Sequence, residues 1–84
     1  MTEQEFDTLV YKLGKRGFKR DDLYFHECPA CAKQSVVIFA IAGRSGGRDI
    51  RVCHECGDAR SSRTGAGMDG RIDDPGFDLA TFLR

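Results

Sequence analysis

The sequence predicts a small α+β domain with an N-terminal amphipathic helix, a three-stranded antiparallel sheet and a short C-terminal helix or tail. Three observations predict this fold class. One apolar stripe at helical spacing opens the chain, a run of β-branched residues occupies its middle, and all four cysteines fall in two short pairs. A chain of 84 residues buries little apolar surface, so we expect an added cross-link to stabilise it.

An amphipathic helix is predicted within residues 1–20. Its apolar stripe, at the spacing i, i+3, i+4 and i+7, consists of Phe6, Leu9, Val10 and Leu13. Thr2 and Glu5 fit a capping box, in which each side chain accepts a hydrogen bond from the other residue's backbone N–H. Gly14 or Gly17 is expected to end the helix, because glycine readily adopts the left-handed conformation that follows many helices.

Basic residues gather at the end of this helix: they are Lys12, Lys15, Arg16, Lys19 and Arg20. Two interpretations are open. These cations form a patch for nucleic acid, or they complement the negative end of the helix dipole and pair with Asp21 and Asp22. The second interpretation is favoured.

Residues 21–63 are predicted to form the sheet. Strands are expected at residues 23–27, 35–41 and 49–53, and the Gly- and Arg-rich residues 42–48 between the last two strands are expected to form a turn. The middle strand is apolar on both faces, so each face needs a cover. The N-terminal helix can cover one face, and the C-terminus or a partner can cover the other.

Residues 64–84 are assigned to a flexible linker and an apolar C-terminal segment. The composition from Ser61 to Gly76 is rich in Gly, Ser and Asp, which is typical of a mobile linker. The apolar residues that follow are Phe77, Leu79, Phe82 and Leu83. They either fold back onto the sheet or serve as anchors that dock on another protein. Fold-back is slightly favoured.

Two C-x-x-C pairs contain every cysteine: Cys28, Cys31, Cys53 and Cys56. Each pair can turn around one side of a metal ion, and a hairpin between the pairs brings them together. Four thiolates close a tetrahedral site and leave no position for a substrate, which is the arrangement of structural Zn²⁺. Gly57, directly after the second pair, suits a turn with positive φ. We do not expect His26 or His54 to be ligands.

This pattern resembles a zinc ribbon over residues 23–60: C-P-x-C, a β-hairpin and then C-x-x-C-G. The resemblance implies a zinc-ribbon sheet with one structural Zn²⁺. Zinc ribbons recur in transcription elongation and initiation factors, RNA polymerase subunits and ribosomal proteins, so the resemblance implies nucleic-acid or transcription machinery as the setting. Two features depart from it. Ala32 stands where such families commonly place Gly, and the hairpin tip lacks the acidic pair through which elongation-factor ribbons work.

Arginines in and after the predicted hairpin form a candidate contact surface for nucleic acid or a protein partner: Arg44, Arg48, Arg51 and Arg60, with Arg63 beyond them. Guanidinium groups contact phosphates, and neighbouring glycines would let the loop adapt to a ligand. Phe39 is the only aromatic residue of the hairpin and is expected in the core, so the hairpin lacks a platform for base stacking.

The sequence therefore predicts a non-enzymatic zinc-binding accessory or adaptor module that docks onto a larger protein assembly in the cytoplasm. Direct nucleic-acid binding through the hairpin arginines is one alternative, and a rubredoxin-like or iron–sulfur electron-transfer subunit is another. No triad spacing or P-loop points to an enzyme, and no small-molecule substrate is expected. The longest apolar run, residues 36–42, is too short to span a membrane, and the polar start lacks a secretion signal.

Overall fold

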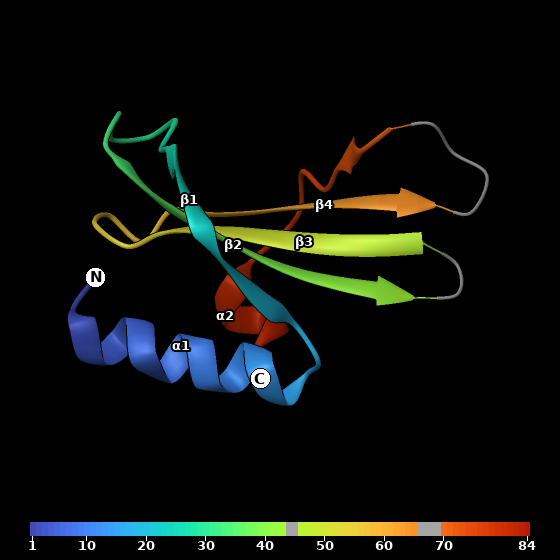
Figure 1. Cartoon of the computed structure of the whole chain (residues 1–84), viewed down its shortest axis with the longest axis horizontal. Coiled ribbons are helices and arrows are strands. Elements are labelled where there is room, and N and C mark those ends of the chain that lie inside the picture. The colour runs from blue at the N-terminus through green and yellow to red at the C-terminus, as the bar shows by residue number, and fades with distance from the viewer. Residues whose placement is uncertain (44–45, 66–69) are drawn as a thin grey trace.

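The computed structural model describes residues 1–43, 46–65 and 70–84, except for the side chains of residues 22–25. The elements follow one another in the order α1 (Glu3–Lys15), β1 (Lys19–Glu27), β2 (Gln34–Gly43), β3 (Gly46–Cys53), β4 (Ala59–Gly65), β5 (Ile72–Asp73) and α2 (Leu79–Phe82). Figure 1 shows the strands as one twisted sheet, with α1 lying along one side of it.

The sheet has five antiparallel strands in the spatial order β1-β2-β3-β4-β5. The predicted α+β class, the antiparallel sheet and the N-terminal helix are confirmed, but the prediction of three strands is wrong. Part of the expected linker, from Ser61 to Gly65, belongs to β4, and β5 supplies a short fifth strand. Residues 66–69 of that expected linker lie outside the described residues.

Strand β4 is polar, and side-chain hydrogen bonds satisfy the polar groups that it buries. Ser61 donates through Oγ to the backbone oxygen of Asp49 at 2.9 Å, and Ser62 donates to the Asp49 carboxylate at 2.6 Å. Asp49 is 4% exposed and also pairs with Arg71. Buried polar groups that find partners in this way cost little, so a strand without apolar alternation can lie inside the sheet.

Helix α1 begins and ends as the sequence predicts. Thr2 accepts a hydrogen bond from the backbone N–H of Glu5 at 3.1 Å, and Glu5 accepts one from the N–H of Thr2 at 3.3 Å, which completes the capping box. Arg16 caps the other end, and Gly17 follows with φ of 92°, a conformation that glycine adopts at least cost.

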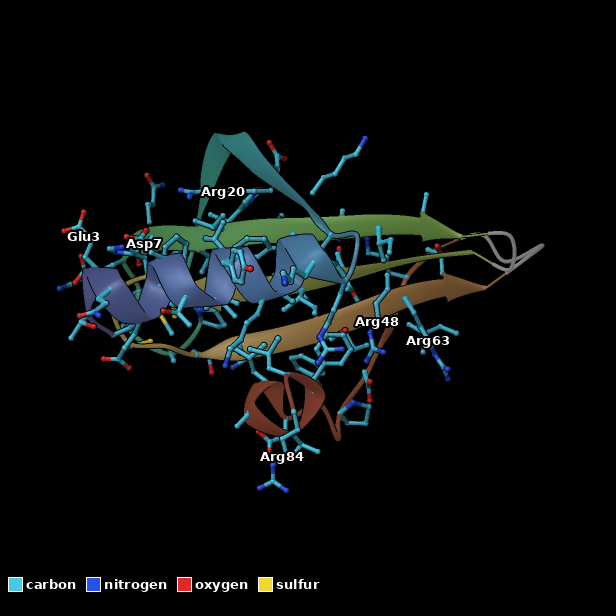
Figure 2. The ribbon with its side chains drawn as sticks, turned by 90° about the horizontal axis from the view of Figure 1, so that it is seen from below. Glu3, Asp7, Arg20, Arg48, Arg63 and Arg84 are labelled. Atoms are coloured by element: carbon cyan, nitrogen blue, oxygen red, sulfur yellow. The ribbon has the colours of Figure 1, made fainter. Side chains whose placement is uncertain are left out.

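Both helices cover the same face of the sheet. Buried residues of α1 and the turn after it pack against one face of β2 and β3, and the core consists of Phe6, Leu9, Leu13, Phe18, Val37, Phe39, Ile50 and Val52. Figure 2 shows α1 and α2 side by side across this face. The opposite face, which carries Ile38 and Arg51, has no helix over it among the described residues. We call this opposite face the open face.

The C-terminal segment folds back onto the core beside α1. Its four apolar residues, Phe77, Leu79, Phe82 and Leu83, are partly buried and pack against the core residues. The Phe82 ring meets the Phe18 ring edge-on, with centroids 5.9 Å apart. The segment therefore covers the same face as α1 and not the open face. Docking of a partner by these four residues stays a prediction.

Arg48 attaches this segment to the sheet. Its guanidinium donates to Ser61 Oγ at 2.9 Å and to the Asp74 carboxylate at 2.8 Å, and it lies over the rings of Phe77 and Phe82. An arginine shared between a carboxylate and two aromatic rings is fixed by several weak interactions at once. Arg48 thus has a structural role in the folded chain.

Replacement of Arg48 by Ala is expected to lower the free energy of unfolding by about 1–3 kcal/mol, because it removes two hydrogen bonds and two ring contacts. Urea unfolding followed by circular dichroism measures the change. Arg63→Ala is the matched control, since Arg63 lies directly across from Arg48 on β4 but is exposed. Equal destabilisation by the two variants would contradict the role assigned to Arg48.

Candidate metal centre

The four cysteines lie in two turns of the same backbone design. In the first turn, Cys28 N–H donates to the oxygen of Lys33, and Ala32 N–H donates to the oxygen of Cys28, both at 2.8 Å. In the second turn, Cys53 and Gly57 occupy the positions of Cys28 and Ala32, with hydrogen bonds of 2.8 and 2.9 Å at the same spacings. We call these two turns the knuckles.

Positive φ closes each knuckle. Gly57 has φ of 80°, as its position after the second cysteine pair predicts, and Ala32 has φ of 61° at the equivalent place in the first knuckle. Ala32 is the only non-glycine residue with positive φ in the described part of the chain. A left-handed alanine costs roughly 1–2 kcal/mol, so the surrounding contacts must hold this turn in place.

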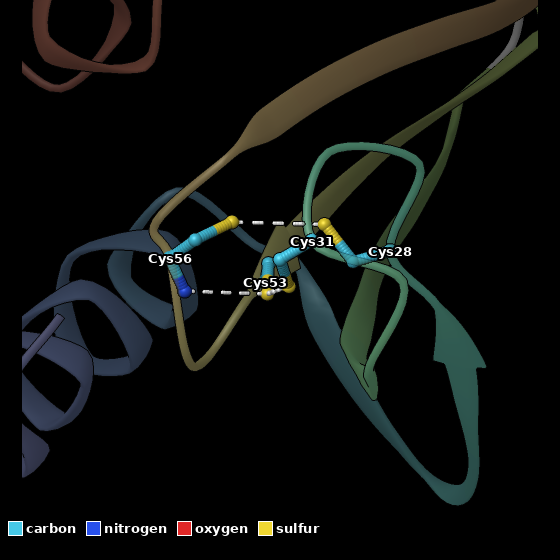
Figure 3. Close-up of side chains that lie close together, drawn as sticks. All are labelled: Cys28, Cys31, Cys53 and Cys56. Atoms are coloured by element: carbon cyan, nitrogen blue, oxygen red, sulfur yellow. Dashed lines mark hydrogen bonds between the residues drawn. The ribbon is translucent and has the colours of Figure 1, made fainter.

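The knuckles bring the four sulfurs together at one end of the sheet (Figure 3). The first knuckle joins β1 to β2 and the second joins β3 to β4, and Val36 lies opposite Cys53 in the sheet. The Sγ atoms of Cys28 and Cys56 are 3.6 Å apart, as are those of Cys31 and Cys53. All four sulfurs lie within 4.8 Å of one another.

These distances suit one tetrahedral ion. With a Zn–S bond of about 2.3 Å, a regular tetrahedron has sulfur–sulfur edges of roughly 3.8 Å. The separations in the structure, from 3.6 Å to at most 4.8 Å, span this value. Four protein sulfurs would complete the coordination of such an ion, which is the structural type of site. Cys28 and Cys53 are buried, whereas Cys56 is exposed, so one corner of the site meets solvent.

Hydrogen bonds direct positive ends of dipoles at the sulfurs. The backbone N–H of Ala30 donates to Cys28 Sγ, and that of Cys56 donates to Cys53 Sγ, both at 3.4 Å. The hydroxyl of Ser35 lies 3.1 Å from Cys53 Sγ. Donors of this kind stabilise thiolates and tune a bound metal.

The cysteine pKa values diverge within this cluster. Burial opposes ionisation of Cys53, but the N–H of Cys56 and the Ser35 hydroxyl outweigh it and lower the pKa of Cys53 to about 6. For Cys56, the N–H of Asp58 favours the thiolate, yet burial and the neighbouring sulfurs raise the pKa to about 12. Thiolates so close together repel one another, and a cation among them removes that repulsion. Metal binding should therefore release protons.

Three contacts tie the knuckles to each other and to the N-terminus. The backbone N–H of His54 donates to the oxygen of Ser35 at 2.8 Å. Lys33 Nζ lies 3.8 Å from the Glu55 carboxylate, and the N-terminal ammonium of Met1 donates to the backbone oxygen of Glu55 at 2.8 Å. The metal centre thus lies where the start of α1 and both knuckles meet.

Neither histidine belongs to the sulfur cluster. The His54 ring meets the Phe6 ring edge-on, with centroids 4.5 Å apart, and so packs against the core. His26 is exposed and lies on the open face. The clustered ligand atoms in the described part of the chain come from the four predicted cysteines.

The predicted arginine surface is spread over both faces of the sheet, and each described member of the predicted contact set has a carboxylate partner. Arg48 pairs with Asp74 on the helix-covered face. Arg51 lies 3.5 Å from Asp73, and Arg60 lies 3.1 Å from Asp58. Arg44 lies outside the described residues. The partners of Arg48 and Arg51 come from a distant segment, which spacing along the chain does not reveal, whereas Asp58 lies only two residues before Arg60.

Comparison with known proteins finds no family model, curated protein or solved structure that matches this chain. The likeness to a zinc ribbon therefore rests on the cysteine pattern and on the four-sulfur cluster. No helix among the described residues is long and apolar enough to cross a membrane.

Cys53→Ser is expected to abolish tight metal binding, because a serine hydroxyl is a much poorer ligand than a thiolate for a soft or borderline metal. His26→Gln, at a residue outside the cluster, should keep one bound ion per chain. Elemental analysis of both purified variants measures the metal content. Retention of a full equivalent of metal by Cys53→Ser would contradict the assignment of ligands.

Proposed function

We propose that this chain is a non-enzymatic zinc-binding accessory module of a larger protein assembly. The observation that supports it is the four-cysteine cluster at the junction of four strands, with all sulfurs within 4.8 Å. A metal at that junction orders the sheet and leaves no open coordination position for catalysis. The metal thus acts on the fold, and the function lies in the surfaces that the fold presents.

Zinc is the metal we assign to this site. Zn²⁺ favours closed tetrahedral thiolate sites, and its binding to small domains is worth roughly 10 kcal/mol or more, which offsets a small core. An iron site of the rubredoxin kind uses the same ligands and remains the competing identity. We favour zinc over iron because the hairpin offers one aromatic residue, Phe39, which lies in the core.

Protein purified without air is expected to be colourless and to contain one zinc per chain. Substitution by Co²⁺ should then give the intense visible absorption of a tetrahedral cobalt–thiolate site. Elemental analysis and absorption spectroscopy measure both properties. A red protein with one iron per chain would contradict the zinc assignment and favour the electron-transfer alternative.

We place the docking surface of the module on the open face. A groove of about 730 Å³ lies there, between the first knuckle and the C-terminal segment. Its lining includes the apolar residues Val36, Ile38, Pro29 and Pro75 and the charged residue Arg51. A lining that mixes apolar and charged side chains is compatible with a protein–protein interface.

One buried hydrogen-bond donor supports the proposal that a partner binds in this groove. Arg51 Nε is buried and has no hydrogen-bond acceptor among the described residues, and its other contact, to Asp73, spans 3.5 Å. Unsatisfied buried donors cost about 1–3 kcal/mol, so an acceptor on a docked protein would recover that energy. This observation favours a protein partner that supplies a carbonyl or carboxylate oxygen above Arg51.

Nucleic-acid or transcription machinery is the proposed setting, and it rests on the resemblance to zinc ribbons alone. The hairpin arginines give little support to direct contact with phosphates. Arg48, Arg51 and Arg60 each lie beside an aspartate, and phosphates would have to displace those carboxylates. Protein docking is therefore the function that we favour for the ribbon.

A photo-crosslinking residue at position 38 is expected to capture one partner protein in the native cell, whereas the same residue at position 8 should not. Thr8 is exposed on α1, so it controls for non-specific capture. Ile38→Glu should then abolish co-purification of that partner and leave the metal content and the melting temperature unchanged. Equal capture from both positions would contradict docking on the open face.

A further inference from the structure

We propose that Cys56 is a site of oxidation by peroxides, and that Cys28 then forms a disulfide with it across the two knuckles and so releases the metal. This inference rests on the proposed zinc site, because it needs four thiolates gathered around one ion. Three features of the metal centre support it: the exposure of one cysteine, the sulfur that lies beside it, and the strands that the new bond would join.

Cys56 is the corner of the metal centre that solvent can reach. Cys28 and Cys53 are buried, Cys31 is half-buried and Cys56 is exposed. A cysteine must lose its proton to bind a metal, so all four sulfurs are thiolates in the loaded protein. Oxidation follows thiolate character and exposure, so among four thiolates the exposed one meets a dissolved oxidant first. Cys56 is therefore the first target.

Cys28 lies where it can complete the reaction. Its Sγ atom is 3.6 Å from that of Cys56, and Figure 3 marks this contact between the knuckles. Cys28 is buried, so it is shielded from the oxidant but not from its neighbour. An exposed thiolate beside a second thiol that can resolve its oxidised form is the usual arrangement of a redox-sensing cysteine.

A peroxide supplies the oxidant, and the reaction has two steps. The Cys56 thiolate attacks one oxygen of the O–O bond, which breaks, so Cys56 becomes a sulfenic acid and the other oxygen takes a proton and leaves as water or an alcohol. The Cys28 thiolate then attacks the Cys56 sulfur, the S–O bond breaks, and hydroxide leaves. Two electrons thus pass from two thiolates to the peroxide. The ion loses two of its four ligands and is released.

The second close pair of sulfurs gives the fully oxidised protein a defined connectivity. The Sγ atoms of Cys31 and Cys53 are also 3.6 Å apart, so a second peroxide would join them in the same way. Four cysteines allow three pairings, and these contacts select Cys28 with Cys56 and Cys31 with Cys53. Pairing within each C-x-x-C would leave the knuckles separate. The selected disulfides instead join the same ends of β1, β2, β3 and β4 that the ion joins.

The test treats the zinc-loaded chain with one equivalent of hydrogen peroxide in the absence of air and follows zinc release with a chromogenic chelator. Free thiols are then alkylated, and the chain is cut with trypsin and a Glu-specific protease. Because Glu55 separates Cys53 from Cys56, these two cysteines fall on different peptides. Mass spectrometry is expected to find the Cys56 peptide linked to the peptide of Cys28 and Cys31, with the alkyl group on Cys31.

Cys56→His is the decisive variant, because an imidazole can hold zinc in the same closed site but cannot form a disulfide. It should slow zinc release by roughly tenfold or more. Cys31→His is the matched control, since it makes the same exchange at the second cysteine of the other knuckle, which is half-buried. The control should lose zinc as the unaltered chain does. Elemental analysis measures the zinc content of both variants before oxidation.

Release of zinc as fast from Cys56→His as from the unaltered chain overturns the proposal. A first disulfide within one C-x-x-C pair, or between two chains, overturns it as well. If Cys56→His fails to hold zinc, the peptide map of the unaltered chain decides by itself. A chain that binds no zinc before oxidation would contradict the zinc site and this inference with it, whereas the other adverse results leave the zinc site intact.

Discussion

Four sulfurs held within 4.8 Å of one another are the constraint on which the rest of this structure depends. Thiolates at such distances repel, and a protein of 84 residues has little core energy with which to hold them together. A divalent cation bound among the thiolates attracts each of them, and this attraction outweighs their mutual repulsion. Because each knuckle joins two strands, one ion would fix the ends of β1, β2, β3 and β4 together. The N-terminus, which donates to Glu55, is positioned by the same junction.

Features encoded by residues close in the chain could be predicted from the sequence. The capping box of α1, its buried stripe, the apolar β2 and both knuckles each depend on spacings of a few residues. Gly57 was predictable for the same reason, since the turn itself demands positive φ. Local chemistry determines these features before any tertiary contact forms.

Features that depend on distant partners could not be predicted. Strand β4 carries no apolar alternation, and Ser61 and Ser62 are buried only because Asp49, on the neighbouring strand, accepts their hydrogen bonds. Arg48 stands in a Gly- and Arg-rich stretch whose composition is typical of an exposed loop. In the structure, however, it contacts Asp74 and two phenylalanine rings of the C-terminal segment. In both cases a polar residue is placed by a partner more than ten positions away. Composition alone therefore predicts a linker and a ligand-binding loop for these two segments.

The arrangement divides the surface of the molecule into parts with different chemistry. Both helices cover one face of the sheet, so the open face keeps a groove. A sheet that is covered on one side leaves its other face available for the docking that we propose.

Amide hydrogen exchange of the metal-loaded and the chelator-treated protein tests the central claim most directly. If the metal organises the fold, its removal will abolish protection of the knuckle amides, such as Ala32 and Gly57, and of the paired strands β2 and β3. Protection that stays the same in both knuckles and in the sheet after complete removal of the metal would contradict the account.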